Sequence, residues 1–220
     1  MRIIAAIAVW NDWELEQTDV YAAYLNASLK EDIYMPQPKG FEEPGQEDKV
    51  IHLKRAIYGL RQSGREWYAD LMDTLTSVGF KRCRVEHAMF YRFDEDATIL
   101  AVDVDDITIA GNSPKAVKRF KEDLGSRYGI KDMGNLQWLL GIGIERDRKN
   151  RTISFSQTAY IQKIIECFKM DDAKQLSIPI SPGHNLMKSH SPTGPNDIED
   201  MRRVPYHEAV GSLMYAVVGT

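Results

Sequence analysis

Residues 98–110 of this chain read TILAVDVDDITIA, and this stretch decides the fold. Apolar residues dominate both 98–104 and 107–110, and the adjacent acids Asp105 and Asp106 separate the two runs. Short runs rich in β-branched residues on either side of a polar pair are typical of a β-hairpin. The stretch therefore predicts two antiparallel strands with two carboxylates at their connection.

These carboxylates indicate either an ordinary turn, which aspartate favours, or a metal site. Neighbouring carboxylates repel one another, and a divalent cation neutralises them; Mg²⁺ binds one or two carboxylates together with substrate phosphates. A third acid, Asp19, ends a strand predicted over 13–20, which could lie beside the hairpin. Two ions about 3.5–4 Å apart on these acids would activate a 3′-hydroxyl and stabilise leaving pyrophosphate.

A second chemistry fits part of the same stretch. Residues 103–107, Asp-Val-Asp-Asp-Ile, nearly match the loop of haloacid-dehalogenase-type phosphatases, in which one aspartate is phosphorylated. That fold needs a parallel sheet with helical crossovers, whereas 107–110 follows at once as a returning strand. The aspartate-nucleophile phosphatase is therefore the less favoured alternative.

Hydrophobic spacing and turn residues predict helices and strands in alternation on both sides of the hairpin. Expected helices lie at 3–10, at 22–30, around 67–78, after the Ser113-Pro114 start signal, around 161–168 and at 206–218. Expected strands lie at 13–20, 88–93, 98–104, 107–110, 136–145 and 152–156, and 32–46 is expected to be a loop. Strands joined by tight hairpins favour an α+β fold with an antiparallel, ferredoxin-like β-α-β-β-α-β sheet.

Composition limits the possible partners and the compartment. The 220 residues include 43% hydrophobic residues, enough for one sizeable core and a small lobe. A net charge of −4 argues against nucleic-acid binding over the whole surface, so phosphate contacts would depend on local basic clusters. The alternative for each cluster is an ordinary solvated surface without a binding role. Cys83 and Cys167 lack disulfide or zinc spacing, and no apolar run approaches a membrane span. An intracellular, cytoplasmic location is expected.

Several blocks in order resemble the reverse transcriptase of copia-type retrotransposon polyproteins. These blocks are 17–26, 33–41, 53–68, 102–111, 133–142, 156–161 and 206–215, and together they extend over nearly the whole chain. The resemblance implies RNA-directed DNA polymerase activity with two Mg²⁺ or Mn²⁺ ions, a template-primer of RNA or DNA, and deoxynucleoside triphosphates.

The resemblance also implies roles for individual residues. Asp19, Asp105 and Asp106 match the catalytic, metal-binding aspartates, and Val20 adjoins them in the metal site. The expected nucleotide-binding residues are Tyr24, which would exclude a 2′-hydroxyl, Gln62, Arg61 and Arg65. Leu140 and Gly141 match the primer grip. From the residues alone, the alternative roles are a core aromatic residue for Tyr24 and a helix-surface residue for Gln62, without nucleotide contact.

The implied architecture is a palm with incomplete fingers and a helical C-terminal extension. Residues 1–176 would form the palm with partial fingers and the start of the thumb, 177–205 a linker, and 206–220 the start of a connection to a ribonuclease H region. That region and the integrase of the polyprotein have no counterpart in this sequence. The upstream fingers, with basic residues that hold the triphosphate, also have no counterpart. We therefore expect poor primer extension by this chain alone; a non-catalytic remnant that binds nucleic acid weakly is the second hypothesis.

One residue departs from the family pattern. Asp103 stands where the family usually has an aromatic residue before Val-Asp-Asp, which adds a charge near the metal site. Residues two apart in a regular strand share a face, so Asp103 and Asp105 would be crowded together. The sequence therefore predicts a bend at Val104 or solvent exposure of Asp103.

Overall fold

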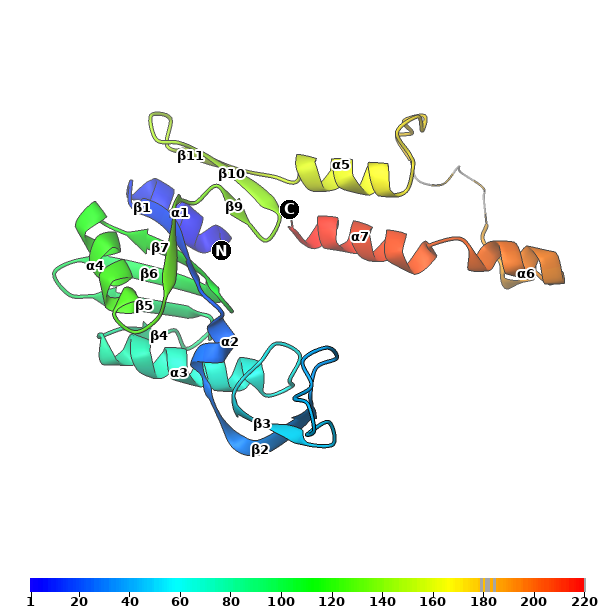
Figure 1. The fold of residues 1–220 in the computed structure, drawn as a ribbon. Coiled ribbons are helices and arrows are strands. Elements are labelled where there is room, and N and C mark those ends of the chain that lie inside the picture. The colour runs from blue at the N-terminus through cyan, green and yellow to red at the C-terminus, as the bar shows by residue number, and fades with distance from the viewer. Residues whose placement is uncertain (179, 181–182, 184, 220) are drawn as a thin grey trace. The chain divides into compact units, whose positions relative to one another are not determined.

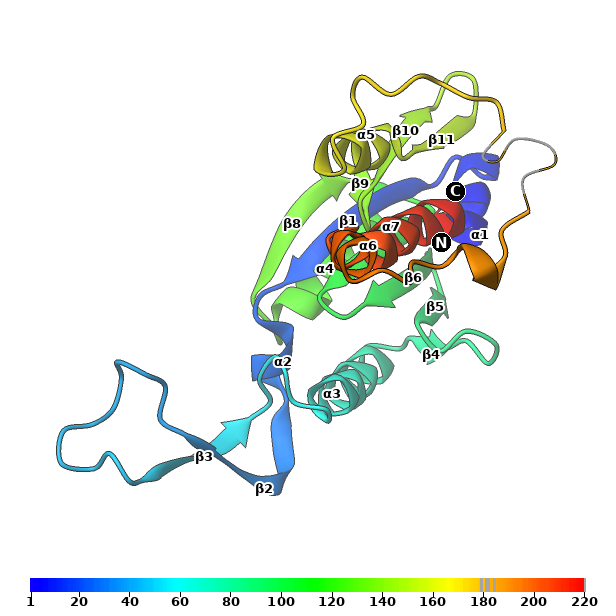
Figure 2. The same ribbon diagram turned by 90° about the vertical axis from the view of Figure 1, so that its right-hand side faces the viewer.

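Figures 1 and 2 show the fold in a computed structural model, which describes residues 1–178, 180, 183 and 185–219. Two compact units are present: one consists of Met1–Leu136 with Arg146–Ile153, and the other of Gln137–Glu145 with Ser154–Thr220. The positions 179, 181, 182 and 184 of the predicted linker, and 220 of the predicted C-terminal connection, lie outside the described residues. No helix in the described part of the chain is long and apolar enough to cross a membrane.

A six-stranded sheet in the order β4-β5-β6-β7-β1-β8 organises the first unit (Figure 1). Its strands are β1 (Glu14–Val20), β4 (Lys81–Arg82), β5 (Met89–Phe93), β6 (Ala97–Asp103), β7 (Asp106–Gly111) and β8 (Ile130–Asn135). All five neighbouring pairs are antiparallel, which confirms the predicted α+β class with an antiparallel sheet. The order inserts β1, from early in the chain, between β7 and β8.

The long helices α3 (Ser63–Ser77) and α4 (Pro114–Gly125) supply most of the helical residues in the main core of this unit. Apolar residues predicted on the inner faces of these helices are buried in it: Trp67, Leu71, Leu75, Val117, Phe120 and Leu124. They pack with residues of the sheet: Val20, Leu100, Ile107 and Ile109. A third helix, α1 (Arg2–Trp10), contacts β1 and β7. Gly111 permits the approach of β7 to α4, since an added Cβ would lie 2.8 Å from Val117 Cγ2.

The region after Asp19 differs from the sequence-based expectation. The predicted helix over 22–30 is only one turn, α2 (Ala23–Asn26), because Ala27 is extended. Residues of β2 (Ser28–Pro36) then pair antiparallel with β3 (Val50–Arg55), so the expected loop over 32–46 begins only after this hairpin strand. Pairing with a partner strand overrides the helical tendency of the sequence.

Residues 130–156 also differ from expectation. β8 was not predicted, and the strand expected over 136–145 is divided into β9 (Trp138–Leu139) and β10 (Ile142–Asp147). With β11 (Thr152–Ser156) they form a three-stranded sheet in the order β11-β10-β9. The remaining helices are α5 (Thr158–Cys167), the 3₁₀ turn η1 (Lys188–His190), α6 (Pro195–Arg202) and α7 (Tyr206–Gly219). η1 and α6 therefore lie within the stretch expected to be a linker.

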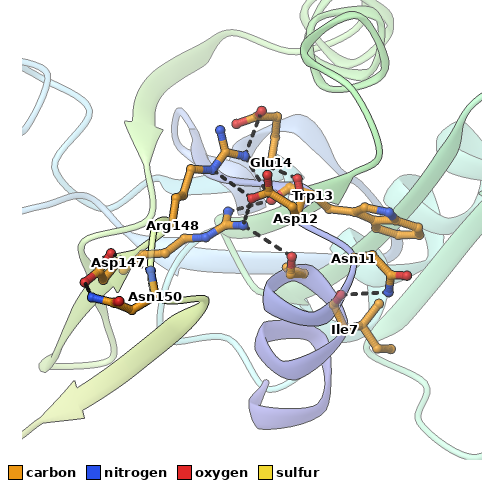
Figure 3. A network of polar contacts seen from close by, with 10 residues as sticks. Ile7, Asn11, Asp12, Trp13, Glu14, Asp147, Arg148 and Asn150 are labelled. Carbon is orange, nitrogen blue, oxygen red and sulfur yellow. Dashed lines mark hydrogen bonds and ion pairs between the residues drawn. The ribbon is translucent and has the colours of Figure 1, made fainter.

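Two arginines of the 146–153 segment, Arg146 and Arg148, bind groups within the protein. The side chain of Arg146 donates to the carbonyl oxygens of Trp13 and Ala8, at 2.5 and 3.3 Å. Figure 3 shows the guanidinium of Arg148 beside the carboxylates of Asp12 and Glu14, with nitrogen–oxygen distances of 3.3 and 2.9 Å. These two arginines connect the 146–153 segment to the α1–β1 turn, so they are engaged by protein groups.

The start of α4 gives a test of the local sequence signals. The Ser113 hydroxyl accepts a hydrogen bond from the backbone N–H of Ala116 at 3.1 Å, and Pro114 occupies the first turn, as the sequence predicts. We expect Ser113→Ala to lower the free energy of unfolding by about 1 kcal/mol, because an N-terminal N–H of the helix loses its acceptor. Urea denaturation measures this change. Ser113→Thr, which keeps the hydroxyl, should retain most of the stability, and equal losses in both variants would contradict the capping explanation.

Candidate active site

The site begins at the β6–β7 hairpin. Asp103 pairs with Asp106 across the two strands, so the connecting residues are Val104 and Asp105, one position earlier than the sequence suggested. Val104 has a φ of 57°, and Asp103 is exposed to solvent. The predicted bend at Val104 and the predicted exposure of Asp103 are both confirmed.

Strand pairing brings the three candidate carboxylates together. Asp19 of β1 lies opposite Asp106 of β7, and directly opposed residues in antiparallel strands have Cα atoms about 4.5–5.5 Å apart with side chains on the same face. The backbone N–H of Val20 donates to the carbonyl oxygen of Asp105 at 2.9 Å, which places the turn beside the end of β1. Residues far apart in sequence thus form one acidic site.

The acids lie on the sheet face opposite the main core. Val20 and Ile107 are fully buried in the core with α3 and α4, and successive strand residues point to opposite faces. Asp19 and Asp106, their immediate neighbours, therefore point away from these helices and remain half-buried. Asp103 continues the same row on β6, and Lys131 continues it on β8.

The pKa of Asp19 reflects both its burial and the acids beside it. Burial raises the pKa of Asp19 above its ordinary value, and the negative charges of Asp105 and Asp106 raise it further. The Lys131 ammonium opposes this shift and lowers the pKa. Bringing a cation to the three carboxylates would favour their charged forms, since opposite charge stabilises a carboxylate.

Two polar side chains that the sequence-based prediction missed contact these acids. Gln17 donates from Nε2 to Asp106 Oδ1 at 2.8 Å, and the Tyr58 hydroxyl donates to Asp105 Oδ2 at 3.4 Å. Gln17 precedes Asp19 by two positions on the same strand, so alternation alone would have placed it on the acidic face. Tyr58 belongs to the loop before α3, and no periodicity connects it with Asp105.

The donor set fits a hard divalent cation. Carboxylate oxygens on neighbouring strands are ligands that Mg²⁺ and Mn²⁺ prefer. Among the described residues, no group of three or more His, Cys, Asp or Glu side chains is already arranged to hold a metal ion. Ion binding would have to break the hydrogen bonds of Asp105 with Tyr58 and of Asp106 with Gln17.

Of the predicted nucleotide-binding residues, Tyr24 is linked to the acids through one residue, Tyr58. It is half-buried in α2, and its ring centroid is 4.5 Å from that of Tyr58, which contacts Asp105. Gln62 is the N-cap residue of α3 and is half-buried, without a side-chain capping bond. Arg61 beside it is exposed. The start of α3 and the tyrosine pair thus belong to the same part of the unit as the carboxylates.

Arg65 has carboxylate partners within the protein. Its guanidinium lies 2.6 Å from Glu31 and 2.8 Å from Glu66, and these contacts raise the pKa of Arg65. Lys30 also pairs with Glu66, at 3.5 Å. A phosphate contact by Arg65 would therefore compete with two existing ion pairs.

The predicted primer grip lies in the second compact unit. Leu140 and Gly141 form the two-residue connection between β9 and β10, with φ values of 49° and 76°. The Tyr215 hydroxyl of α7 donates to the carbonyl oxygen of Leu140. Glycine suits this left-handed turn, whereas leucine adopts it at a cost in backbone energy.

The raised pKa of Asp19, caused first by burial and then by the neighbouring charges, predicts a pH-dependent effect on stability. Since the folded-state pKa of Asp19 is raised, its charged form destabilises the metal-free fold above that pKa, and this destabilisation is absent below the unfolded-state pKa. We expect Asp19→Asn to raise Tm at pH 7 by about 1–4 °C without metal, and the difference to vanish at acidic pH. Thermal denaturation followed by circular dichroism measures it. A lower Tm for Asp19→Asn at pH 7 would contradict the described electrostatics.

Comparison with known proteins adds independent information. A family model described as "Reverse transcriptase (RNA-dependent DNA polymerase)" matches residues 1–182. The chain is 38% identical over its full length to the "Retrovirus-related Pol polyprotein from transposon TNT 1-94" of Nicotiana tabacum, of which it covers 17%. It is 33% identical over 98% of its length to the corresponding polyprotein from transposon RE1 of Arabidopsis thaliana, of which it covers 14%.

A shorter relative matches a larger share of its own length. The chain is 33% identical, over 90% of its residues, to the "Putative transposon Ty5-1 protein YCL074W" of Saccharomyces cerevisiae, of which it covers 62%. The chain thus corresponds to a small part of the long plant polyproteins and to most of this yeast protein.

Proposed function

Because this chain belongs to the reverse transcriptase family found in the Pol polyproteins of copia-type transposons, we propose that it carries out RNA-directed DNA synthesis by two-metal nucleotidyl transfer. The observation that carries this proposal is the pairing of Asp19 with Asp106 beside Asp105. Two acids on paired strands and a third in the adjoining turn lie near one another, and this is where a shared pair of cations would be held.

In this proposal the ions are Mg²⁺ or Mn²⁺, held by Asp19, Asp105 and Asp106 next to the backbone of Val20. When bound, such ions supply Lewis acidity for the attacking 3′-hydroxyl and the leaving pyrophosphate. The protein's own contribution is placement: β1 and β7 fix two carboxylates at opposed positions, and the turn fixes the third. Tyr58 and Gln17 bind two of these carboxylates in the metal-free protein and would release them as the ions bind.

Nucleotide recognition would use residues around the start of α3. Tyr24, packed on Tyr58, would contact the sugar and disfavour a 2′-hydroxyl. Gln62 and Arg61 would contact the incoming deoxynucleoside triphosphate, and Arg65 would join them after release from Glu31 and Glu66. The turn at Leu140 and Gly141 would approach the primer end.

The strand order supports a palm architecture for this proposal. The sequence β1, α3, β6, β7, α4, β8 follows a β-α-β-β-α-β path, and the spatial order β8-β1-β7-β6 is that of a ferredoxin-like sheet. Residues 1–176 would then contain the palm with partial fingers and the start of the thumb, followed by a linker over 177–205 and a helical connection over 206–220. The phosphatase alternative needs a parallel sheet, whereas the pairs of the six-stranded sheet are antiparallel.

Primer extension tests the function directly. The chain is incubated with a DNA primer on an RNA template and deoxynucleoside triphosphates, with Mg²⁺, with Mn²⁺, or with a chelator. The proposal expects metal-dependent extension, which the same chain fused to upstream sequence of a related element should carry out faster. Salt-sensitive binding of the template-primer without extension by either protein would instead indicate a non-catalytic remnant.

A further inference from the structure

The Val104–Asp105 turn contains a backbone conformation that its own sequence does not favour. Val104 has a φ of 57°, in the left-handed region, where the Cβ of a β-branched residue approaches the carbonyl oxygen that follows. A residue keeps such a conformation only where surrounding contacts hold it. The turn therefore needs a support outside the hairpin.

Trp67 of α3 provides a direct contact to this residue. Its indole N–H donates from Nε1 to the carbonyl oxygen of Val104 at 2.7 Å, and the Trp67 side chain is 2% exposed. The ring of Trp67 is itself fixed by an edge-on contact with Tyr128, at 5.1 Å between centroids. Tyr128 is held in turn by hydroxyl contacts with Asp70 and Thr74, at 2.6 and 2.8 Å.

The two peptide groups that flank Asp105 are both anchored. The carbonyl of Val104, in the peptide before Asp105, accepts from Trp67, and the carbonyl of Asp105, in the peptide after it, accepts from the N–H of Val20. Two fixed peptide planes determine the direction of the Cα–Cβ bond between them. The direction of the Asp105 side chain therefore depends on one contact to α3 and one contact to β1.

Side-chain packing around Val104 does not hold the turn in place of the hydrogen bond from Trp67. A cavity of about 300 Å³ lies beside the ring and the turn, lined by Trp67, Val104 and Tyr24 among other residues. Val104 is 37% exposed, so its side chain is not enclosed by a close-packed core. The hydrogen bond from the indole, more than van der Waals contact, keeps this carbonyl in place.

We infer that Trp67 is a positioning residue for the metal site, because its indole N–H holds the turn that directs the Asp105 carboxylate. The inference rests on the proposed function, in which Asp105 binds a cation. Trp67 itself contacts neither the ion nor a substrate. Partners that orient metal ligands typically contribute about 10–100-fold to metal affinity.

The experiment measures Mn²⁺ binding by isothermal titration calorimetry, together with Tm, for matched variants of the full chain. Trp67→Phe keeps an aromatic ring and removes the indole donor together with part of the buried ring system. Tyr68→Phe is the control, because it removes an aromatic donor to a backbone carbonyl, that of His87, from the neighbouring residue of α3. We expect about 10–100-fold weaker Mn²⁺ binding for Trp67→Phe and wild-type binding for Tyr68→Phe.

A rescue variant separates positioning from general stability. Glycine adopts a positive φ without steric cost, so Val104→Gly in the Trp67→Phe background should recover part of the lost Mn²⁺ affinity. A purely structural role of Trp67 predicts no recovery, because Val104→Gly restores no core contact. Absence of any recovery would overturn the inference.

The remaining outcomes are also decisive. Equal Mn²⁺ affinity of the wild type and Trp67→Phe, with Asp105→Asn binding much more weakly, would overturn the inference and leave the proposed function intact. Wild-type binding that Asp105→Asn does not alter would overturn both. If Trp67→Phe does not fold, deuterium exchange of the wild-type indole protons decides: protection of Trp67 relative to the 81% exposed Trp10 supports the contact, and equally fast exchange overturns it.

Discussion

Asp105→Asn is expected to reduce metal-dependent primer extension by at least about 100-fold, the loss typical of removing one preorganised electrostatic group from a reaction centre. Asparagine keeps the size of the side chain and removes its charge. The backbone contact of Asp105 with Val20 does not involve the side chain, so the turn should be preserved. Single-turnover extension with saturating primer-template measures the loss in the chemical step.

Asp103→Asn is the matched control for that experiment. It removes the same charge from the same hairpin, at an exposed position that lies opposite Asp106 in the strand register. We expect only a small change in rate, because Asp103 is not one of the proposed metal ligands. A loss as large as that of Asp105→Asn would show that the row of acids acts through its total charge and would contradict the assigned ligands.

Tyr24→Ala is expected to have the second largest effect, on the choice between deoxyribonucleotides and ribonucleotides. The tyrosine ring packs against Tyr58 next to the acidic site, so its removal opens space where a 2′-hydroxyl would lie. Steric exclusion of one small group by a pocket is worth about 10–200-fold. The ratio of kcat/KM for the two nucleotide types should therefore shift by this order towards ribonucleotides.

Tyr24→Phe distinguishes a steric effect from a hydrogen-bonding effect. It keeps the ring and removes the hydroxyl, so it should retain the selectivity of the wild type. If Tyr24→Phe loses selectivity as fully as Tyr24→Ala, the hydroxyl and not the bulk of the ring controls the choice. Unchanged selectivity in Tyr24→Ala would show that Tyr24 is a core aromatic without this role.

Local signals in the sequence were sufficient to predict the two hairpin strands and the helices that pack on them. The apolar runs around Asp105 and Asp106 gave the two strands, because alternation and β-branched residues act over a few positions. Ser113 and Pro114 gave the start of α4 for the same reason. The apolar spacing from Trp67 onward gave α3. The family was indicated by the order of the motifs, and the comparisons confirm it.

Elements that depend on distant partners were not predictable in this way. β8 has no buried residue and contains Lys131, Asp132, Gly134 and Asn135, which are uncommon in strands; it forms because it pairs with β1 at the edge of the sheet. The helix after Asp19 was predicted too long because Ser28–Pro36 pairs with β3. In both places, strand pairing decides the structure.

Within the candidate site, the residue types were predictable and their contacts were not. Three acids could be proposed as neighbours, but the register that sets Asp19 opposite Asp106 is a property of the assembled sheet. The bond from Trp67 to the carbonyl of Val104 has no sequence signal, since its acceptor is a backbone group. Arg65 was predicted to bind the nucleotide, and the structure pairs it with Glu31 and Glu66.

The most direct test of the central claim is anomalous X-ray diffraction from crystals of the chain with Mn²⁺, a primer-template and a non-hydrolysable deoxynucleoside triphosphate analogue. The proposed function predicts two manganese peaks about 3.5–4 Å apart, bound by carboxylate oxygens of Asp19, Asp105 and Asp106. Manganese peaks only at other sites, with these three carboxylates still in contact with protein groups alone, would contradict it.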